Sequence, residues 1–270
     1  MVNSKTLFPP NVHGVPLSQP FRSVVWLLLQ KQLDFRVVLT VPGSTSPNGS
    51  RHPAYMGKTA VATVPVLQCK ENLYIPECCA ILKYLCEINR WHDMYPGSNP
   101  DSVVLVDAYL HWHHHNTRLL RVCIGPYLRP DIPLQGERSQ RQWERVRSVL
   151  QALNDFWLQH GWIGSDHVTI ADLVAYEEVV QLTITGLIND SRIVGFDGVW
   201  NVVFPNVHSW VERMERLPFH DVVHACLRAL GPLNPERVPE MRQVVVAASK
   251  AGLKAMRRAQ ESYSRNYSKL

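Results

Sequence analysis

The sequence lacks long apolar runs, and it also lacks a dense block of basic residues. Its apolar runs at 24–29 and 244–248 are far shorter than the roughly 20 residues that a membrane-spanning helix requires, so we expect no membrane span. The first residues, Met1 to Lys5, contain no apolar signal-peptide core. The net charge is +5, from 28 Lys and Arg against 23 Asp and Glu, but no basic block alternates with aromatic residues. A nucleic-acid surface is therefore not indicated.

Zinc-binding spacings are missing as well. The six cysteines follow no zinc pattern, and three of them, Cys78, Cys79 and Cys86, lie within or beside one apolar helical pattern. We expect the cysteines to be reduced and buried like small apolar side chains. His111 and His115 are one helical turn apart, which suits a metal pair, but no carboxylate completes a metal motif. The sequence therefore predicts no metal site.

The first third of the chain contains a mixture of short strand and helix patterns. Residues 17–30 predict a helix, because Ser18 can cap it, Pro20 suits its first turn and apolar residues follow at helical spacing. A second helix is predicted from Glu77 onward, and short strands are predicted at 35–39, 64–67 and 73–75. Three prolines precede Ser18, and proline is poorly accommodated in a central strand. We therefore expect either a short strand at 15–17 or a reshaped entrance to a site there.

Strand patterns nearly vanish after a polar linker rich in Pro and Gly at 95–100. Helices are predicted at 101–125, 137–160, 169–187 and 206–217. The last forty residues form a basic helical pattern with a thin apolar stripe. These patterns predict an α/β domain at 1–92, an all-helical domain at 101–230 and a basic C-terminal extension at 231–270.

Several local motifs occur together in a fixed order along the chain. They are Leu17-Ser18-Gln19-Pro20 followed by Arg22, Val64-Pro65-Val66-Leu67, Glu77 followed by Ala80-Ile81-Leu82, Val106-Asp107-Ala108-Tyr109-Leu110, and Thr169-Ile170-Ala171-Asp172-Leu173. In this order the set resembles the glutathione S-transferases and is most similar to their theta class. The resemblance implies the glutathione S-transferase fold, with a thioredoxin-like N-terminal domain that binds glutathione as a co-substrate. It also implies an all-α C-terminal domain with a hydrophobic substrate pocket, a homodimer and no metal.

Ser18 is the candidate catalytic residue. Free thiols ionise near pH 8.5, so little of the glutathione thiol is ionised at neutral pH. A hydroxyl that donates a hydrogen bond to the sulfur favours the thiolate, and a helix N-terminus at the same place adds to this effect. Arg22, one turn further along, can add positive potential. The alternative from position alone is that Ser18 only caps its helix.

The resemblance also implies the residues that hold glutathione. Val64 and a cis Pro65 present their backbone to its cysteinyl part, and Glu77 and Cys78 begin a helix that holds its γ-glutamyl group. Cys78 stands where relatives carry serine, and a thiol is a weaker hydrogen-bond donor than a hydroxyl. The family also implies that Arg51 and His52 hold the glycine carboxylate, although the loop length differs here. Thr63 stands where relatives often carry Lys or Gln.

His114 and Arg118 are expected, from the theta-class resemblance, to line the substrate pocket between the domains. Asp172 fits a Thr-x-x-Asp capping box and is interpreted as a folding device. The predicted reaction is attack of the glutathione thiolate on a small hydrophobic electrophile or on an organic hydroperoxide. Two other functions remain open. One is a non-catalytic module that binds a protein partner, and the other is thiol–disulfide exchange through Cys78, whose pKa a helix N-terminus can lower.

The last three residues, Ser268-Lys269-Leu270, match a C-terminal address that the peroxisomal import receptor reads. Basic and polar residues precede them, including Arg257, Arg258 and Arg265, which is typical of an exposed tail. The sequence therefore predicts a peroxisomal location. It leaves open whether the extension at 231–270 folds over the active site as a lid.

Overall fold

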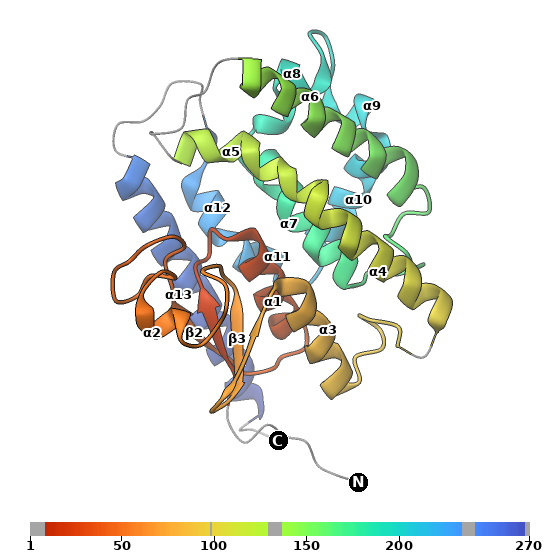
Figure 1. Cartoon of the computed structure of the whole chain (residues 1–270). Helices are drawn as coiled ribbons and strands as arrows, with labels where there is room; N and C mark the ends of the chain where they lie inside the picture. The colour runs from red at the N-terminus through yellow and green to blue at the C-terminus, as the bar shows by residue number, and fades with distance from the viewer. Residues whose placement is uncertain (1–8, 98, 129–136, 234–240, 268–270) are drawn as a thin grey trace.

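A computed structural model describes residues 9–97, 99–128, 137–233 and 241–267. The tripeptide Ser268–Leu270 lies outside this range, so the peroxisomal address stays a prediction. The described chain forms a small α/β domain followed by a larger helical domain (Figure 1). None of the described helices is long and apolar enough to cross a membrane.

A four-stranded sheet forms the centre of the N-terminal domain. Its strands are β1 (Asn11–Gly14), β2 (Arg36–Leu39), β3 (Val66–Lys70) and β4 (Leu73–Pro76), in the order β2-β1-β3-β4. β1 and β2 are parallel, whereas β1–β3 and β3–β4 are antiparallel. The three strands predicted at 35–39, 64–67 and 73–75 are present with small shifts of their ends.

The first strand differs from its predicted position at 15–17. β1 occupies Asn11–Gly14, where Val12 pairs with Val37 on one side and Leu67 on the other. Pro9 and Pro10 precede this strand and Pro16 follows it, so no proline interrupts its hydrogen bonds. The prolines therefore lie on either side of the strand, and a turn connects β1 to Ser18.

Two long helices cover the sheet of the N-terminal domain. The helix α1 (Gln19–Gln30) and the helix α3 (Cys78–Asn89) both begin where the sequence predicted helices, and the short α2 (Pro53–Met56) lies between β2 and β3. α1 carries a continuous buried run from Phe21 to Leu29. It is buried on all sides because the sheet lies against one face and the helical domain against the other.

The helical domain is organised around α7 (Ile170–Ile184), in which the residues from Ile170 to Leu182 are buried. The predicted helix at 101–125 is divided at Asn116 into α4 (Pro100–His115), η1 (Thr117–Leu120) and α5 (Arg121–Leu128). The predicted helix at 137–160 ends earlier, as α6 (Glu137–Ala152) followed by a π-helical turn η2 (Leu153–Trp157). The remaining elements are η3 (Leu187–Asn189), α8 (Ser191–Val194), α9 (Trp200–Val203), α10 (Pro205–Glu215), α11 (His220–Val223) and α12 (Ala225–Leu230).

The predicted capping box at the start of α7 is present. The Thr169 hydroxyl accepts a hydrogen bond from a helix N–H, and the Asp172 carboxylate accepts one from the Thr169 N–H at 2.9 Å. Asp172 also accepts hydrogen bonds from the Ile163 N–H at 3.1 Å and from Trp210 Nε1 at 2.9 Å. Its carboxylate therefore joins three segments of the helical domain.

The two domains are joined by a fully buried ion pair between α1 and α7. Arg22 Nε donates to Glu177 Oε2 at 2.5 Å, and neither side chain is more than 1% exposed. His224 Nε2 lies 3.0 Å from the other carboxylate oxygen of Glu177. Burial acts to raise the pKa of Glu177, but the nearby Arg22 and His224 outweigh it and hold this pKa below its usual value.

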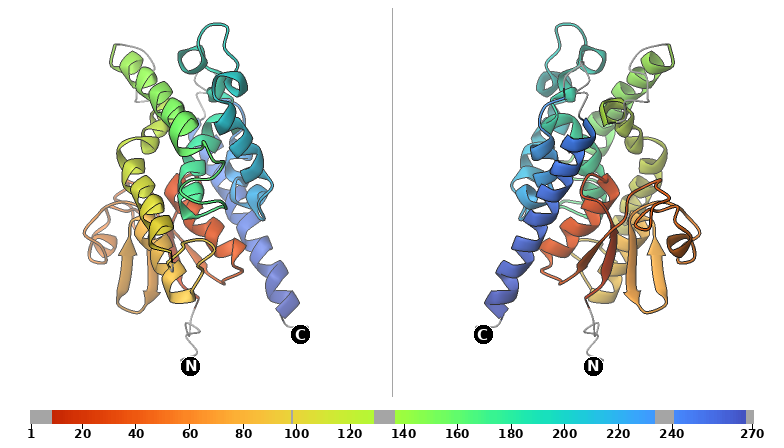
Figure 2. Two further views of the ribbon diagram at one scale, coloured as in Figure 1. Left: turned by 90° about the vertical axis from the view of Figure 1, so that its right-hand side faces the viewer. Right: turned by 90° about the vertical axis from the view of Figure 1, so that its left-hand side faces the viewer.

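The C-terminal helix α13 (Met241–Tyr267) returns from the helical domain and runs down beside the N-terminal domain (Figure 2). It packs on α11 and α12, and Gln260 Nε2 donates to the Phe35 carbonyl oxygen at 2.9 Å. Gly252 lies against the turn before Ser18, where a β-carbon would come within 2.8 Å of Pro16 and 2.9 Å of Cys226. This extension therefore packs along both domains.

Candidate functional site

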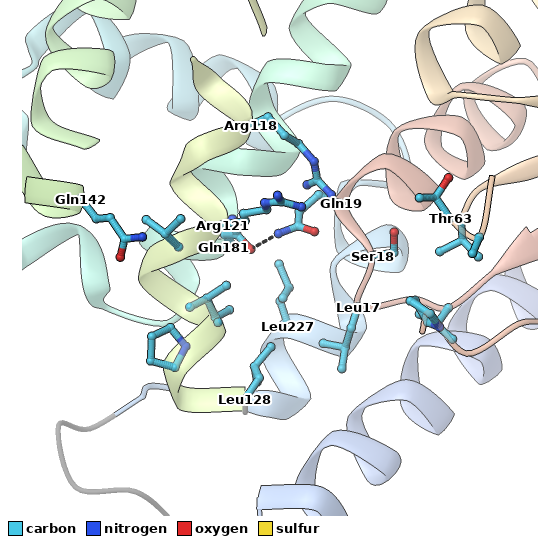
Figure 3. A pocket seen from close by; sticks show the side chains of 18 of the residues that line it. Leu17, Ser18, Gln19, Thr63, Arg118, Arg121, Leu128, Gln142, Gln181 and Leu227 are labelled. Carbon is cyan, nitrogen blue, oxygen red and sulfur yellow. Dashed lines mark hydrogen bonds between the residues drawn. The ribbon is translucent and has the colours of Figure 1, made fainter. Parts of the chain in front are cut away.

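A cavity of about 600 Å³ lies between the two domains. Ser18 and Thr63 contribute to its wall from the N-terminal domain, and α5, α6, α7 and α12 enclose it from the helical domain (Figure 3). Apolar side chains form much of the lining: Val15, Leu17, Val64, Val122, Ile124, Leu128, Trp143 and Leu227. A cavity of this size and composition suits a small apolar molecule. In the part of the chain that the structure describes, no residue of α13 lines it.

Ser18 lies at the N-terminus of α1 on the wall of this cavity. It has the extended backbone conformation of an N-cap, with φ −77° and ψ 119°, but its side chain caps no helix N–H. The Ser18 backbone N–H closes the preceding turn by donating to the Val15 carbonyl oxygen at 3.0 Å. Within the described residues the hydroxyl itself makes no hydrogen bond. The hydroxyl is therefore free to donate to a group in the cavity.

Arg22 holds the turn that carries Ser18. Its Nη1 donates to the carbonyl oxygens of Pro16 at 3.2 Å and Leu17 at 3.0 Å. The guanidinium is fully buried and paired with Glu177, so it does not face the cavity. The expectation that Arg22 adds positive potential at the site is therefore replaced by a positioning role, which the local sequence could not reveal because Glu177 lies 155 residues away.

A chain of polar side chains crosses the inner end of the cavity. Gln19 Nε2 donates to Gln181 Oε1 at 2.6 Å (Figure 3), and Gln181 Nε2 donates to Glu178 Oε2 at 3.3 Å. Arg118 Nη1 in turn donates to Glu178 Oε1 at 2.5 Å. Burial raises the pKa of Glu178 even though Arg118 acts to lower it. The guanidinium groups of Arg118 and Arg121 form a cationic part of the cavity wall, which is otherwise largely apolar.

A second, smaller chamber of about 160 Å³ continues from the polar end. It shares Thr63, Val64, Arg118 and Arg121 with the cavity. Its other lining residues are Pro20, Pro65, Glu77, Cys78, His113 and His114. The structure thus brings together around one chamber the predicted residues Val64, Pro65, Glu77, Cys78, His114 and Arg118, whereas Ser18 faces the larger cavity beside it.

Two backbone features shape the small chamber. The Val64–Pro65 peptide bond is cis, as the family resemblance implied. Glu77 has φ +69° and ψ 118°, an uncommon conformation for a residue with a side chain. It precedes α3 but makes no side-chain cap, so the first N–H groups of this 12-residue helix are left without a cap from Glu77 at the chamber.

His113 is a residue of the chamber that the sequence reading did not select. It is 2% exposed, and its Nδ1 has no hydrogen-bond partner among the described residues. Burial lowers its pKa to about 3, so the imidazole is neutral at physiological pH. A buried polar atom of this kind is expected to have a partner, and this nitrogen is available to a polar group that enters the chamber.

Other predicted residues lie away from the two cavities. Arg51 is exposed, and His52 caps α2 through Nδ1, which accepts from the Ala54 N–H at 3.3 Å. Neither residue lines either of these two cavities, and their role in holding a carboxylate stays a prediction. Conversely, Gln19, Arg121 and Gln181 line the cavity but were missed. The Gln19–Gln181 contact joins residues 162 positions apart, so no local pattern could reveal it.

The histidines of α4 do not form a metal site with other ligands. Within the ranges that the structure describes, no group of three or more His, Cys, Asp or Glu side chains could hold a metal ion. His113 is buried, whereas His111, His114 and His115 are exposed. The buried His113 and the three exposed histidines therefore do not share one environment.

Two family models match this chain. The glutathione S-transferase N-terminal domain matches residues 12–90, and the glutathione S-transferase C-terminal domain matches residues 136–213. Glutathione S-transferase theta-2 of Mus musculus is 30% identical over 159 residues, which cover 56% of this chain and 59% of that protein. Glutathione S-transferase theta-1 of Gallus gallus is 31% identical over 126 residues, which cover 44% and 47%. The chain thus matches only 47% to 59% of the length of these curated relatives.

Solved structures with the same architecture cover nearly the whole chain. Human glutathione transferase theta-2, solved with glutathione and an unknown ligand, aligns with a TM-score of 0.69 at 19% identity over 90% of this chain and 99% of that one. Human glutathione-S-transferase T1-1 in its apo form gives 0.66 at 21% identity over 92% and 99%. At these identities the likeness concerns the fold. It confirms the two-domain architecture predicted from the sequence.

Proposed function

Since this chain belongs to the glutathione S-transferase family, we propose that it is a glutathione transferase. Its substrates are glutathione and a small hydrophobic electrophile or organic hydroperoxide. The observation that carries the proposal is the free hydroxyl of Ser18, at a helix N-terminus on the wall of a largely apolar cavity. A thiolate at this position receives a hydrogen bond and the favourable end of a helix dipole.

Glutathione fits the two connected spaces with its thiol at Ser18 and its γ-glutamyl end in the small chamber. The carboxylate of Glu77 suits the amino group of the ligand, and the uncapped N–H groups of α3 suit the α-carboxylate. The Nδ1 atom of His113, which has no hydrogen-bond partner among the described residues, offers one more polar contact to the γ-glutamyl end. Val64, which lines both spaces, presents its backbone between the two ends of the ligand.

The reaction follows from the placement of these groups. The Ser18-stabilised sulfur attacks an electrophilic carbon, a carbon–sulfur bond forms and the leaving group departs with the electron pair. With a hydroperoxide, the sulfur attacks the outer oxygen and the O–O bond breaks. A second glutathione then completes the reduction to alcohol, water and glutathione disulfide. The apolar lining excludes water and holds the electrophile beside the sulfur.

A substitution of Ser18 by Ala tests the proposal. Loss of the hydrogen bond to the thiolate should raise the pKa of bound glutathione by about one unit or more and lower turnover at neutral pH by about tenfold or more. The thiolate absorbance of bound glutathione, titrated against pH, measures the first effect, and conjugation kinetics measure the second.

The matched control is Ser23→Ala in the same helix. The Ser23 hydroxyl is buried and lies 3.2 Å from the Gln19 carbonyl oxygen, away from the cavity. The Ser23→Ala substitution should therefore leave the pKa of bound glutathione unchanged. Equal effects of the two substitutions, or unchanged turnover in Ser18→Ala, would show that Ser18 only starts its helix.

A further inference from the structure

The guanidinium of Arg121 is a cation of the site with which no described residue pairs. Arg118 and Arg121 both line the larger cavity and the small chamber. Arg118 is paired, because its Nη1 donates to Glu178 Oε1. The side chain of Arg121, in contrast, forms neither an ion pair nor a hydrogen bond with any residue that the structure describes. The proposed transferase mechanism gives this second arginine no task.

The carboxylate of Glu178 acts on Arg121 but is already engaged by other donors. Its Oε1 accepts from Arg118, and its Oε2 accepts from Gln181 Nε2 at 3.3 Å. Burial and the neighbouring Arg118 therefore lower the pKa of Arg121, and Glu178 opposes them only in part. Since Glu178 balances the charge of Arg118, Arg121 is a surplus positive charge on the cavity wall.

Arg121 stands beside the apolar part of the larger cavity. It is the first residue of α5, and Val122, Ile124 and Leu128 of the same helix form part of the apolar lining (Figure 3). Arg121 is exposed, so its guanidinium is accessible to a molecule in the cavity. An apolar molecule that fills the cavity removes water from this group, and the loss of hydration of a charge is costly unless an opposite charge replaces the water.

Glutathione, in the position proposed above, does not supply that opposite charge. Its γ-glutamyl end carries one ammonium and one carboxylate. The ammonium suits Glu77, and the carboxylate suits the N–H groups of α3 that have no side-chain cap from Glu77. The glycine carboxylate belongs to the other end of the tripeptide, beyond the thiol. The charge that matches Arg121 must then come from the second substrate, which occupies the apolar cavity.

We propose that the second substrate is an apolar electrophile with a carboxylate, which Arg121 binds in the larger cavity. This substrate class rests on the proposed transferase function. The planar guanidinium matches a carboxylate through two parallel hydrogen bonds. A single surplus positive charge also matches a single negative charge, whereas a doubly charged phosphate would leave one charge unbalanced against apolar side chains. Unsaturated carbonyl compounds and organic hydroperoxides that end in a carboxylate belong to this class.

Ligand binding to the full-length protein tests the carboxylate site apart from catalysis. Calorimetry at pH 7 compares 4-phenylbutanoate with 4-phenylbutan-1-ol, which are similar in size and differ in charge. We expect the carboxylate to bind at least about tenfold more tightly than the alcohol, which is the scale of a hydrogen bond to a charged group. Equal affinities, or no binding of either ligand, would overturn the proposal.

Substitutions of Arg121 locate the carboxylate. Arg121→Gln should weaken the binding of the carboxylate alone, and an unchanged affinity for the alcohol would show that the cavity is intact. Arg121→Lys keeps the charge and should retain part of the preference. The matched control is Arg145→Gln, which removes a positive charge from an exposed arginine of α6 that lines neither cavity. This control should keep the full preference, whereas a preference that survives in Arg121→Gln would overturn the assignment.

Two further measurements connect this site to the proposed reaction. The preference for the carboxylate should persist with saturating S-methylglutathione, which has no free thiol, and its loss would show that Arg121 binds a carboxylate of glutathione instead. In conjugation kinetics, kcat/KM for 4-(chloromethyl)benzoate relative to its methyl ester should fall by about tenfold or more in Arg121→Gln. An unchanged ratio would overturn the substrate class. Conjugation of 1-chloro-2,4-dinitrobenzene, which carries no carboxylate, tests the transferase function by itself, so its failure is distinguishable from that of this inference.

Discussion

Replacement of Arg22 by Met should destabilise the protein strongly without changing a residue that lines the cavity. The substitution keeps a long apolar side chain but removes the guanidinium that binds Glu177 and the carbonyl oxygens of Pro16 and Leu17. Glu177 is 0% exposed, and among the described residues His224 would be the one remaining partner of its carboxylate. Removal of one partner of a buried ion pair costs about 3–5 kcal/mol of unfolding free energy.

A double substitution separates the free-energy contribution of the Arg22–Glu177 ion pair from the other contributions to this cost. Arg22→Met combined with Glu177→Leu removes both charges, and a buried ion pair replaced by apolar side chains is often close to neutral. The carbonyl oxygens of Pro16, Leu17 and Glu177 would still lose their donor, and the buried His224 Nε2 would lose its partner on Glu177, at about 1 kcal/mol each. We therefore expect the double variant to lose about 4 kcal/mol. It should still be more stable than the Arg22→Met single variant, which loses the same carbonyl contacts in addition to the cost of the broken ion pair.

Urea unfolding, followed by tryptophan fluorescence, measures these free energies. Trp26 lies in α1, and its Nε1 donates to the Pro218 carbonyl oxygen at 2.8 Å, so its emission reports on the same interface. A loss below about 1 kcal/mol in Arg22→Met would refute the reasoning, since a buried carboxylate without its partner cannot cost so little. A double variant less stable than the single variant would show that the pair stabilises the fold by itself.

Two further predictions concern glutathione and assembly. In calorimetry, Cys78→Ser should bind glutathione several-fold more tightly than the natural protein, because one hydroxyl hydrogen bond contributes about 0.5–1.5 kcal/mol. Absence of binding by both proteins would instead support a non-catalytic module that binds a protein partner. We also propose a homodimer on the basis of the family resemblance. Light scattering should then give about twice the 30.8 kDa mass of one chain, and a mass of one chain would contradict it.

Much of the fold could be predicted because its signals are local. Ser18 and Pro20 indicate the start of α1, and the box formed by Thr169 and Asp172 indicates the start of α7. Short β-branched runs likewise indicate β2 to within one residue and β3 to within three residues. β1 was misplaced because its three neighbouring prolines suggested a disturbed strand, whereas they lie outside it.

The site was predictable only where it follows such local motifs. Ser18, Val64 and Cys78 line the two cavities, and each belongs to a motif of adjacent residues. Arg22 is paired with Glu177, and Gln19 is hydrogen-bonded to Gln181. Both partners come from the other domain, and no spacing in the sequence connects them. Pairing across the interface is therefore the part of the site that required the structure.

The close packing of Gly252 against Pro16 links the sequence of the last helix, α13, to the sequence of the turn before Ser18. At this position a side chain larger than hydrogen would press on Pro16, in the same turn that Arg22 fixes and Ser18 ends. Gly252 and Pro16 are more than two hundred positions apart in the sequence, yet a larger side chain at one position requires a smaller one at the other. In related chains we expect the two to vary together, so that a larger residue in the tail accompanies a smaller one before the serine. The sequence of the C-terminal helix and that of the turn before Ser18 are in this sense constrained by each other.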